Sequence, residues 1–224
     1  MDDDDDDDDI DVEYKIILAG ESMVGKTTLF KKVSTGIFRG NNISTIGIDK
    51  KTFELEIKAE KEGKEFQKKV KINLVDTGAQ EKFQVITKRY FRWANAALLL
   101  YDITNKKTFD NLNHWLNFIN KNINPNGYHK EYLIFLMGTK LDIVNQFPEK
   151  RQVKEEDAKE FCQNESLIWK GECSSKDFSD ENYKKILSEI AQELFKNFKP
   201  QKVVKLKIPS SYMRRRRERT KCDA

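Results

Sequence analysis

The sequence predicts an α/β fold, with a six-stranded, mostly parallel sheet, one antiparallel edge strand and helices on both faces. Three observations predict it. Short, continuous apolar runs recur along the chain, as in strands that are buried on both faces. Segments with helical spacing alternate with these runs, which is typical of strand–helix–strand units. One pair of runs instead alternates apolar and polar residues, as a hairpin does, and it supplies the antiparallel edge.

In the first third of the chain, glycine and charged residues bound the apolar runs and thereby indicate where the expected elements begin and end. Residues 12–19 form an apolar run that ends at Gly20, as a buried strand does, and residues 25–33 then predict a helix. Apolar residues alternate in residues 51–57 and again in 70–75, so we expect a hairpin. The charged segment 58–69, around Gly63, is expected to be the turn between these two strands.

Farther along the chain, strands and helices are expected to alternate. Buried strands are predicted at 96–101 and 133–137, and a shorter extended segment at 167–169. The helical segments are marked by 3.6-residue spacing. They lie at Phe109, Leu112, Leu116 and Ile119, at residues 157–162, and in a long amphipathic stretch over residues 183–198.

Charge divides the 224-residue chain into three parts. Residues 1–11 hold nine Asp and no base, which predicts an acidic disordered tail; a solvated tail and an acidic docking arm both stay open. Residues 12–198 are expected to form one folded domain. Residues 199–224 form a basic tail with ten Lys and Arg against two acids. Because the charge lies at the ends, the composition argues against a basic nucleic-acid-binding core.

Several protein classes are disfavoured by what the sequence holds. No apolar run approaches the ~18–20 residues of a membrane span, and the acidic start lacks the features of a secretory signal. Three cysteines without metal or disulfide spacing favour a reducing, cytoplasmic setting. His114 and His129 are the two histidines, which leaves little room for histidine-based catalysis.

The strongest motif is GESMVGKT at residues 20–27, which matches the phosphate-binding pattern G-x-x-x-x-G-K-[ST] between a strand and a helix. Backbone N–H groups of such a loop and helix wrap phosphates. Lys26 is expected to bridge the terminal phosphates, and the Thr27 hydroxyl to bind Mg²⁺. The phosphate-binding residues are predicted to be Gly20, Ser22, Val24, Gly25, Lys26, Thr27 and Thr28.

Two further segments indicate which nucleotide is bound. Thr139, Lys140 and Asp142 follow the strand at 133–137, and a carboxylate there accepts two donors from guanine but finds no such pair on adenine. Ser174, Ser175 and Lys176 follow the next strand, where backbone N–H groups meet the guanine oxygen. Ligands of open α/β sheets bind at these strand ends. An ATP-dependent kinase is the alternative if Asp142 does not bind the base.

Residues 12–198 resemble a small GTPase of the Ras superfamily, specifically of the Rab family, and thus a P-loop NTPase. The motifs that carry this resemblance are GESMVGKTTL (20–29), STIGID (44–49), DTGAQEKF (76–83), LLLYDITNKKTFDNLNHW (98–115), GTKLD (138–142) and ECSSK (172–176). The resemblance implies a monomeric switch in vesicle traffic that binds GTP or GDP with Mg²⁺ and slowly hydrolyses GTP. It also implies an exchange factor, a GTPase-activating protein and effectors as partners.

The resemblance implies roles for particular residues. Phe38 would pack against guanine, and Thr45 would bind Mg²⁺ and the γ-phosphate. Asp76 would hold Mg²⁺ through water, so the expected metal-binding residues are Thr27, Thr45 and Asp76. Ala79 would offer its N–H to the γ-phosphate, and Gln80 would orient the attacking water. Gln80, Lys26 and Thr45 are therefore the expected catalytic residues. The guanine pocket would consist of Thr139, Lys140, Asp142, Ser174, Ser175 and Lys176.

The sequence departs from the family in the second switch motif, on the effector surface and near the C-terminus. Gly78 and Ala79 stand in the reverse of the usual Ala–Gly order, so a hydrolysis-impaired GTP-binding scaffold remains the alternative function. Lys50 and Val75 replace two aromatic residues of the effector surface, which predicts a non-standard set of effectors. Cys222 lies in no standard prenylation pattern. The basic cluster around 214–221 leaves three interpretations open: attraction to a membrane surface, a solvated tail, and nuclear or nucleic-acid contact. The first implies a peripheral membrane location.

Overall fold

The computed structural model describes residues 12–38, 48–61, 64–77, 84–92, 94–123, 132–177 and 179–198. These residues contain one six-stranded sheet in the order β2-β3-β1-β4-β5-β6, in which β2 is antiparallel to β3 and the other pairs are parallel. The predicted sheet is therefore confirmed. The strands are β1 (Val12–Ala19), β2 (Asp49–Lys61), β3 (Lys64–Asp76), β4 (Ala96–Asp102), β5 (Leu133–Thr139) and β6 (Ile168–Glu172).

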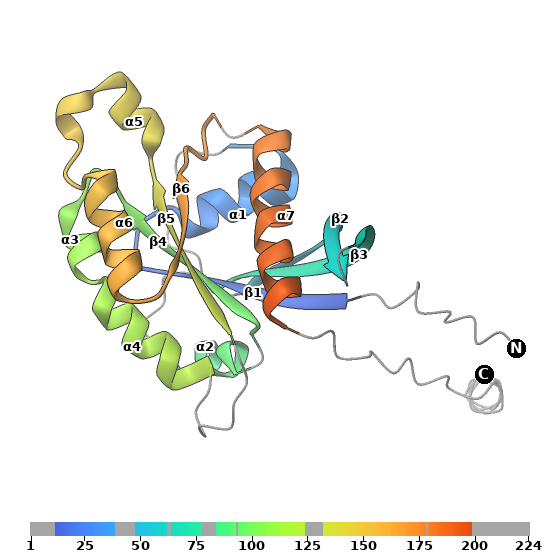
Figure 1. The fold of residues 1–224 in the computed structure, drawn as a ribbon. Coiled ribbons are helices and arrows are strands. Elements are labelled where there is room, and N and C mark those ends of the chain that lie inside the picture. The colour runs from blue at the N-terminus through green and yellow to red at the C-terminus, as the bar shows by residue number, and fades with distance from the viewer. Residues whose placement is uncertain are drawn as a thin grey trace, which may run out of the picture.

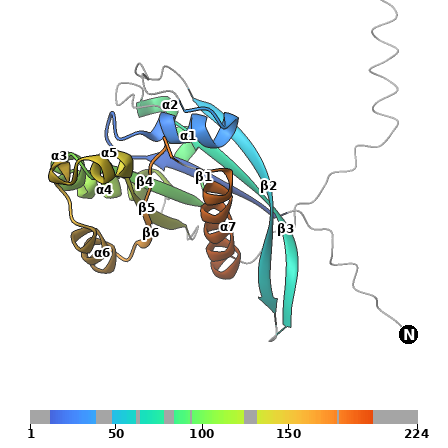
Figure 2. The same cartoon turned by 90° about the horizontal axis from the view of Figure 1, so that it is seen from above.

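Helices cover both faces of the sheet, as Figures 1 and 2 show. They are α1 (Lys26–Thr35), α2 (Gln84–Phe91), α3 (Lys106–Asp110), α4 (Leu112–Ile123), α5 (Leu141–Gln146), α6 (Glu155–Asn164) and α7 (Asp180–Asn197), with a 3₁₀ turn at Pro148–Lys150. Side chains of α1 and α7 pack on one face, and those of α2, α4 and α6 on the other. The short helices α2 and α5 were not predicted from the sequence.

The strand β1 shows how the apolar runs produce this arrangement. Successive side chains of a strand point to opposite faces. Ile16 and Leu18 accordingly lie in the cluster beneath α1 and α7, whereas Ile17 and Ala19 lie in the cluster beneath α4. Residues 16–19, where β1 has a neighbouring strand on each side, therefore need apolar residues at every position, and the sequence IILA supplies them. On α4, Leu112, Leu116 and Ile119 are buried, as their helical spacing predicts.

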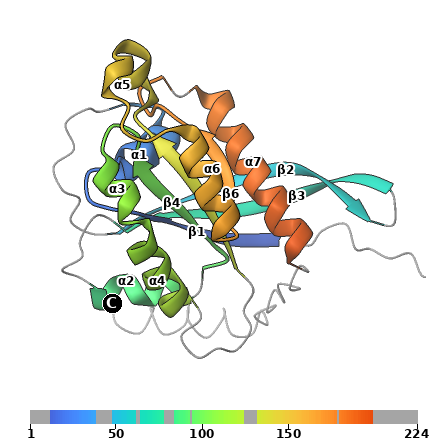
Figure 3. The same cartoon turned by 60° about the vertical axis from the view of Figure 1, so that its left-hand side comes forward.

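The hairpin is longer than the sequence predicts. The predicted charged turn at 58–69 is wrong for the described residues: β2 continues through 58–61 and β3 begins at Lys64, and the two stay paired from Asp49↔Asp76 to Lys61↔Lys64. Phe66 packs against Phe195 of α7, with ring centroids 6.3 Å apart. Figure 3 shows the resulting two-stranded ribbon running out beyond the sheet alongside α7. The charged residues therefore lie on strands, because α7 supplies an apolar surface for one face of the ribbon.

The described helices include none that has both the length and the apolar character of a membrane span. The predicted acidic segment 1–11 and basic segment 199–224 lie outside the described residues. The division of the chain at residues 12 and 198 stays a prediction.

Candidate nucleotide-binding site

The parallel strands place the predicted site residues at one edge of the sheet. Gly20 follows β1, Asp76 ends β3, Thr139 ends β5, and Ser174 comes two residues after β6. Since β1, β3, β4, β5 and β6 run in the same direction, their carboxyl ends meet at this edge. Ligands of open α/β sheets bind there.

The phosphate loop follows a path that its glycines make accessible. Gly20 has φ +126°, and a Cβ at this position would lie 2.2 Å from the Leu100 carbonyl oxygen. Gly25 has φ +101° and directly precedes α1. Both positions require a residue without a side chain, since other residues rarely adopt these angles. Met23 has φ +66° and is 69% exposed, so its side chain points outward.

The first turn of α1 has the features of an anion site. Gly25 precedes the helix and gives no side-chain cap, and the first turn carries no acidic residue. In contrast, α7 is capped by Ser179, whose hydroxyl oxygen accepts a hydrogen bond from the Asn182 N–H. A helix start without a side-chain cap presents its N–H groups and its positive dipole end to an anion.

Lys26 lies within the loop with its ammonium at the loop carbonyls. Its Nζ donates hydrogen bonds of 2.6 Å to the carbonyl oxygens of Gly20 and Glu21. The residue is buried. An ammonium at this position can also bind an anion that the loop holds. It would give up its hydrogen bond to one carbonyl oxygen and donate to a phosphate oxygen instead, because the charged oxygen is the stronger acceptor.

A buried hydroxyl–carboxylate pair joins the helix to the sheet beside the loop. The Thr27 hydroxyl donates a 2.6 Å hydrogen bond to Asp76 Oδ2. Asp76 is fully buried at the end of β3. Mg²⁺ prefers such oxygen ligands and is held in proteins by one or two of them together with phosphates and water. Thr27 and Asp76 therefore fit a magnesium site, with Thr45 as the further predicted ligand.

On the other side of the loop, Thr139 connects the base-binding segment to the phosphate loop. Its hydroxyl lies 2.6 Å from the Val24 carbonyl oxygen and 2.9 Å from that of Tyr101. Thr139 is buried. One short side chain thus fixes β5, β4 and the phosphate loop relative to one another.

Lys140 and Asp142 follow at the turn into α5. Lys140 adopts a left-handed conformation with φ +68°, and its Nζ lies 2.6 Å from Asp102 Oδ2. Asp142 lies in the first turn of α5, where a carboxylate is favourable to the helix dipole. The backbone N–H of Leu141, between them, donates to the Cys173 carbonyl at 3.1 Å. This bond joins the two segments that are expected to hold guanine.

The segment after β6 is organised around Ser174. The Ser174 hydroxyl oxygen accepts hydrogen bonds from the N–H groups of Lys176 and Asp177, at 3.2 and 3.1 Å. Before it, the Cys173 N–H donates to the Gly138 carbonyl at 2.8 Å. Burial raises the pKa of the Cys173 thiol to about 12, so this side chain stays neutral.

An ion pair between Arg151 and Glu172, the last residue of β6, lies next to this segment in the chain. Arg151 and Glu172 form two parallel hydrogen bonds of 2.7 Å each, and the Glu172 side chain is buried. The hydrogen bonds with Glu172 raise the pKa of Arg151. Such bidentate pairing adds geometric specificity.

The sequence did not identify several residues of this site. Asp102 and Arg151 are among them, together with the Glu21 carboxylate, which accepts a 3.1 Å hydrogen bond from Asn111 Nδ2. The sequence signals for Asp102 were its place directly after an apolar strand and its place in the motif at 98–115, neither of which gives it a role at the site.

The contacts described above include none from four of the predicted site residues. Thr45, Ala79 and Gln80 lie outside the described residues. Phe38 is described and is 38% exposed, and its contact with the base stays a prediction.

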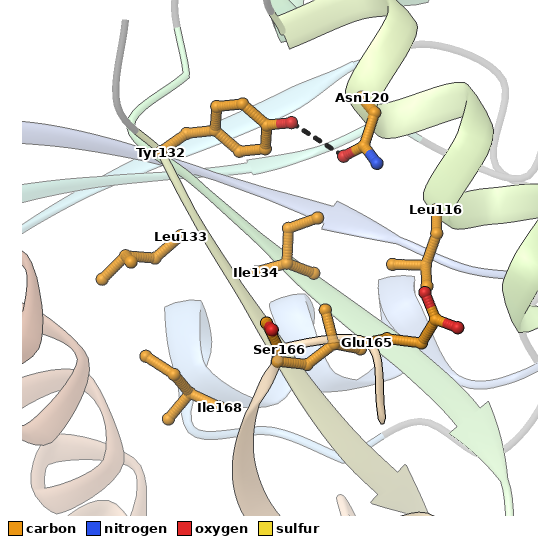
Figure 4. A pocket seen from close by; sticks show the side chains of 9 residues that line it. Leu116, Asn120, Tyr132, Leu133, Ile134, Glu165, Ser166 and Ile168 are labelled. Atoms are coloured by element: carbon orange, nitrogen blue, oxygen red, sulfur yellow. Dashed lines mark hydrogen bonds between the residues drawn. The ribbon is translucent and has the colours of Figure 1, made fainter. Parts of the chain in front are cut away.

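A cavity of about 270 Å³ lies at the opposite ends of β5 and β6, as Figure 4 shows. Its lining includes Leu116 and Ile134, and Tyr132 donates a 2.8 Å hydrogen bond to Asn120 Oδ1 at its edge. The cavity holds none of the predicted nucleotide-binding residues. It is therefore separate from the site.

Comparison with known protein families gives a match to the Ras family over residues 15–196. The chain is 37% identical over 160 residues to the Ras-related protein Rab11A of Lotus japonicus, covering 71% of this chain and 63% of the relative. It is 39% identical over 152 residues to the Ras-related protein Rab-26 of Rattus norvegicus, covering 67% of this chain and 54% of the relative.

The chain is also similar to the Ras-related protein Rab-19 of Xenopus laevis over a longer stretch, with 35% identity over 184 residues. This match covers 82% of this chain and 78% of the relative. The matches to the lotus and rat proteins, in contrast, span less than two thirds of those relatives.

Proposed function

The chain belongs to the Ras family, as a Rab-type small GTPase, and from this premise we propose that it is a guanine-nucleotide switch that hydrolyses GTP slowly and acts in vesicle traffic. The observation that carries the proposal is the arrangement around the phosphate loop. The Thr27–Asp76 pair lies on one side of the loop, and Thr139, Lys140 and Asp142 lie on the other. The proposal includes binding of GTP and GDP with Mg²⁺.

The described residues support the binding steps of this function. The first N–H groups of α1 and the Lys26 ammonium would hold the phosphates, while Thr27 and Asp76 would hold the metal. When bound, Mg²⁺ neutralises charge on the phosphates. Gln80 would orient the attacking water, and Thr45 and the segment around Ala79 would sense the γ-phosphate, as the resemblance implies.

Base recognition gives the sharpest test of the nucleotide. We expect GDP and GTP to bind far more tightly than ADP and ATP in a competition assay with a fluorescent nucleotide. Asp142→Asn should lose the preference for guanine and gain affinity for xanthine nucleotides, because the amide donates where the carboxylate accepts. Unchanged guanine affinity in this variant would contradict the role of Asp142. Equal affinity of the native protein for ATP would favour the kinase alternative.

Hydrolysis is tested separately from binding. The Gly78–Ala79 order favours a slow reaction, because Ala79 has less backbone freedom than the glycine usual at this place. Single-turnover GTP hydrolysis should be measurable in the native protein and faster in Ala79→Gly. No hydrolysis in the native protein, with GTP binding intact, would support the scaffold alternative instead.

Membrane attachment, in this proposal, depends on the basic tail and gives a peripheral location. The arginines at 214–217 would be attracted to anionic lipid, and this attraction is screened by salt. Unmodified protein should therefore co-sediment with anionic liposomes at low salt, and removal of residues 210–224 should abolish this binding. Persistence at high salt would contradict an electrostatic tail. A prenyl group on Cys222, found by mass spectrometry, would show a conventional anchor.

The traffic role predicts partners that depend on the nucleotide. An exchange factor, a GTPase-activating protein and effectors would contact the segments around Thr45 and residues 76–92. Protein loaded with a GTP analogue should capture vesicle-traffic proteins that GDP-loaded protein does not. Capture that is the same in both states would contradict a switch. Size-exclusion chromatography should show a monomer.

A further inference from the structure

Asp102 is a buried carboxylate that no motif of the nucleotide site includes. It ends β4 and is 4% exposed. Its register partner is Thr139, the last residue of β5 and the first of the predicted base-binding residues. Burying a charge is costly unless it is paired and hydrogen-bonded, so this position calls for a specific partner.

Hydrogen bonds hold the Asp102 carboxylate in one orientation. Its Oδ1 accepts from the Thr104 N–H at 2.9 Å and from the Thr104 hydroxyl at 2.6 Å. The Asp102 N–H lies 3.0 Å from the hydroxyl oxygen of Thr108, which is itself buried. One carboxylate oxygen is thereby fixed, and Oδ2 is directed toward Lys140.

Lys140 is the cation that Asp102 holds, within the part of the chain that the structure describes. Its Nζ lies 2.6 Å from Asp102 Oδ2, and about a third of the side chain is exposed. The backbone of Lys140 is left-handed, with φ +68°, which residues other than glycine rarely adopt. Such a conformation persists only where the surroundings over-determine it. The ion pair constrains the end of the Lys140 side chain. The hydrogen bond from the Leu141 N–H to the Cys173 carbonyl oxygen constrains the next residue of the backbone.

We propose that Asp102 is a positioning residue for the guanine base, acting through Lys140. The ion pair fixes the ammonium, so the aliphatic stem of Lys140 lies in one conformation and forms a preformed wall of the base pocket. Without Asp102, Lys140 would have to be ordered by the nucleotide itself, at a cost in affinity. The inference rests on the proposed function, because it requires that the base lies beside Lys140.

The test is a double-mutant cycle on nucleotide release. Asp102→Asn keeps the size of the side chain and removes its charge, and Lys140→Met keeps an apolar stem and removes the ammonium. Release of GDP with a fluorescent ribose label should be roughly tenfold faster in each single variant. The double variant should release it no more than about twofold faster than Lys140→Met alone, because the two residues act as one unit.

Two measurements separate positioning from loss of structure. The ratio of release rates between Asp102→Asn and native protein should be the same with Mg²⁺ and with a chelator, since the pair lies on the base side. Asp110→Asn is the matched control, because Asp110 pairs with Lys106 at 3.3 Å on the exposed surface of α3, and it should release GDP at the native rate.

If Asp102→Asn does not fold, a second variant, Thr104→Val, tests the same proposal. Thr104→Val removes the 2.6 Å hydroxyl bond that orients Asp102 but keeps the ion pair. It should speed release about two- to threefold.

The outcomes are distinguishable. Native protein that does not bind labelled GDP would overturn the proposed function. Native binding with release rates that multiply in the double variant, or with unchanged release in Asp102→Asn or Thr104→Val, would overturn the positioning role of Asp102 alone.

Discussion

On the base side of the nucleotide site, Thr139 and Lys140 bond to neighbouring strands and to the phosphate loop, whereas on the phosphate side Lys26 bonds to its own loop. Thr139 bonds to carbonyl oxygens of the phosphate loop and of β4, and Lys140 bonds to the buried Asp102. Lys26 bonds to carbonyls of its own loop, and Thr27 bonds to Asp76. The base side is therefore organised before a ligand arrives.

The difference indicates how binding energy would be divided between the two sides. A preorganised pocket loses little conformational freedom on binding, so its contacts contribute to affinity and specificity. Lys26 and Thr27 would have to exchange their present partners for phosphate and metal, and such exchange makes affinity depend on the charge of the ligand. The following predictions test this comparison, from the largest expected effect to the smallest.

The largest effect is expected on the phosphate side. Lys26→Met should weaken binding of GDP and GTP by about 3 kcal/mol, roughly a hundredfold, because it removes charge-assisted bonds to phosphate. Guanosine, which has no phosphate, should bind the variant as it binds the native protein. Competition titrations with the two ligands measure both values. An equal loss for guanosine would show that the two sides are not separable.

On the base side, Thr139→Val should reduce the free energy of unfolding by about 2 kcal/mol. The variant keeps the shape of the side chain and removes the hydroxyl that serves the Val24 and Tyr101 carbonyls. Urea unfolding measures the change. Thr35→Val is the control, since the Thr35 hydroxyl donates to Lys31 on the exposed end of α1, and its effect should stay within about 0.5 kcal/mol. Equal destabilisation by both variants would contradict the conclusion that the Thr139 hydroxyl stabilises the base side through its bonds to the phosphate loop and β4.

Thr27→Asn should shift the nucleotide preference toward GDP by about 1 kcal/mol, roughly fivefold, because GTP depends more on the metal than GDP does. Displacement of a fluorescent nucleotide over a range of Mg²⁺ concentrations measures the shift. At low Mg²⁺ the native protein and the variant should converge. A shift that is independent of Mg²⁺ would contradict the role of Thr27 as a metal ligand.

A further prediction concerns access to solvent. Cys173, on the base side, is buried with a pKa near 12, so a thiol reagent at pH 8 should leave it unlabelled. A cysteine at the exposed position of Met23, introduced as Met23→Cys, should be labelled within minutes. Comparable rates at the two positions, measured by peptide mass spectrometry, would show that the base side is open.

The same thiol makes a prediction for alkaline pH. The folded pKa of Cys173 is raised above its unfolded value of about 8.5, so the unfolded chain loses the proton first. The stability that this thiol contributes is complete below pH ~8.5 and is lost as the pH rises toward 12. Cys173→Ala should flatten this part of the pH–stability curve in urea unfolding.

The sequence was sufficient for the sheet and for the motifs but not for every contact. Continuous apolar runs identify central strands, since both of their faces need burial, and the spacing of GESMVGKT identifies the loop. The ribbon was misread because Lys and Glu in residues 58–69 are typical of turns. Its support by Phe195 of α7 is a long-range contact. Asp102 was missed for a similar reason, because its partner Lys140 follows a different strand, β5, and nothing local marks the pair.

The long ribbon of β2 and β3 also has a consequence for engineering and for evolution. Its strands are paired residue for residue up to Lys61↔Lys64, so a change at the tip that adds or removes one cross-strand pair leaves the register nearer the sheet intact. A single-residue deletion within one strand, in contrast, would turn every later side chain to the other face. The tip therefore offers a permissive insertion point for an epitope or fluorescent tag, at the end of the ribbon remote from Asp76.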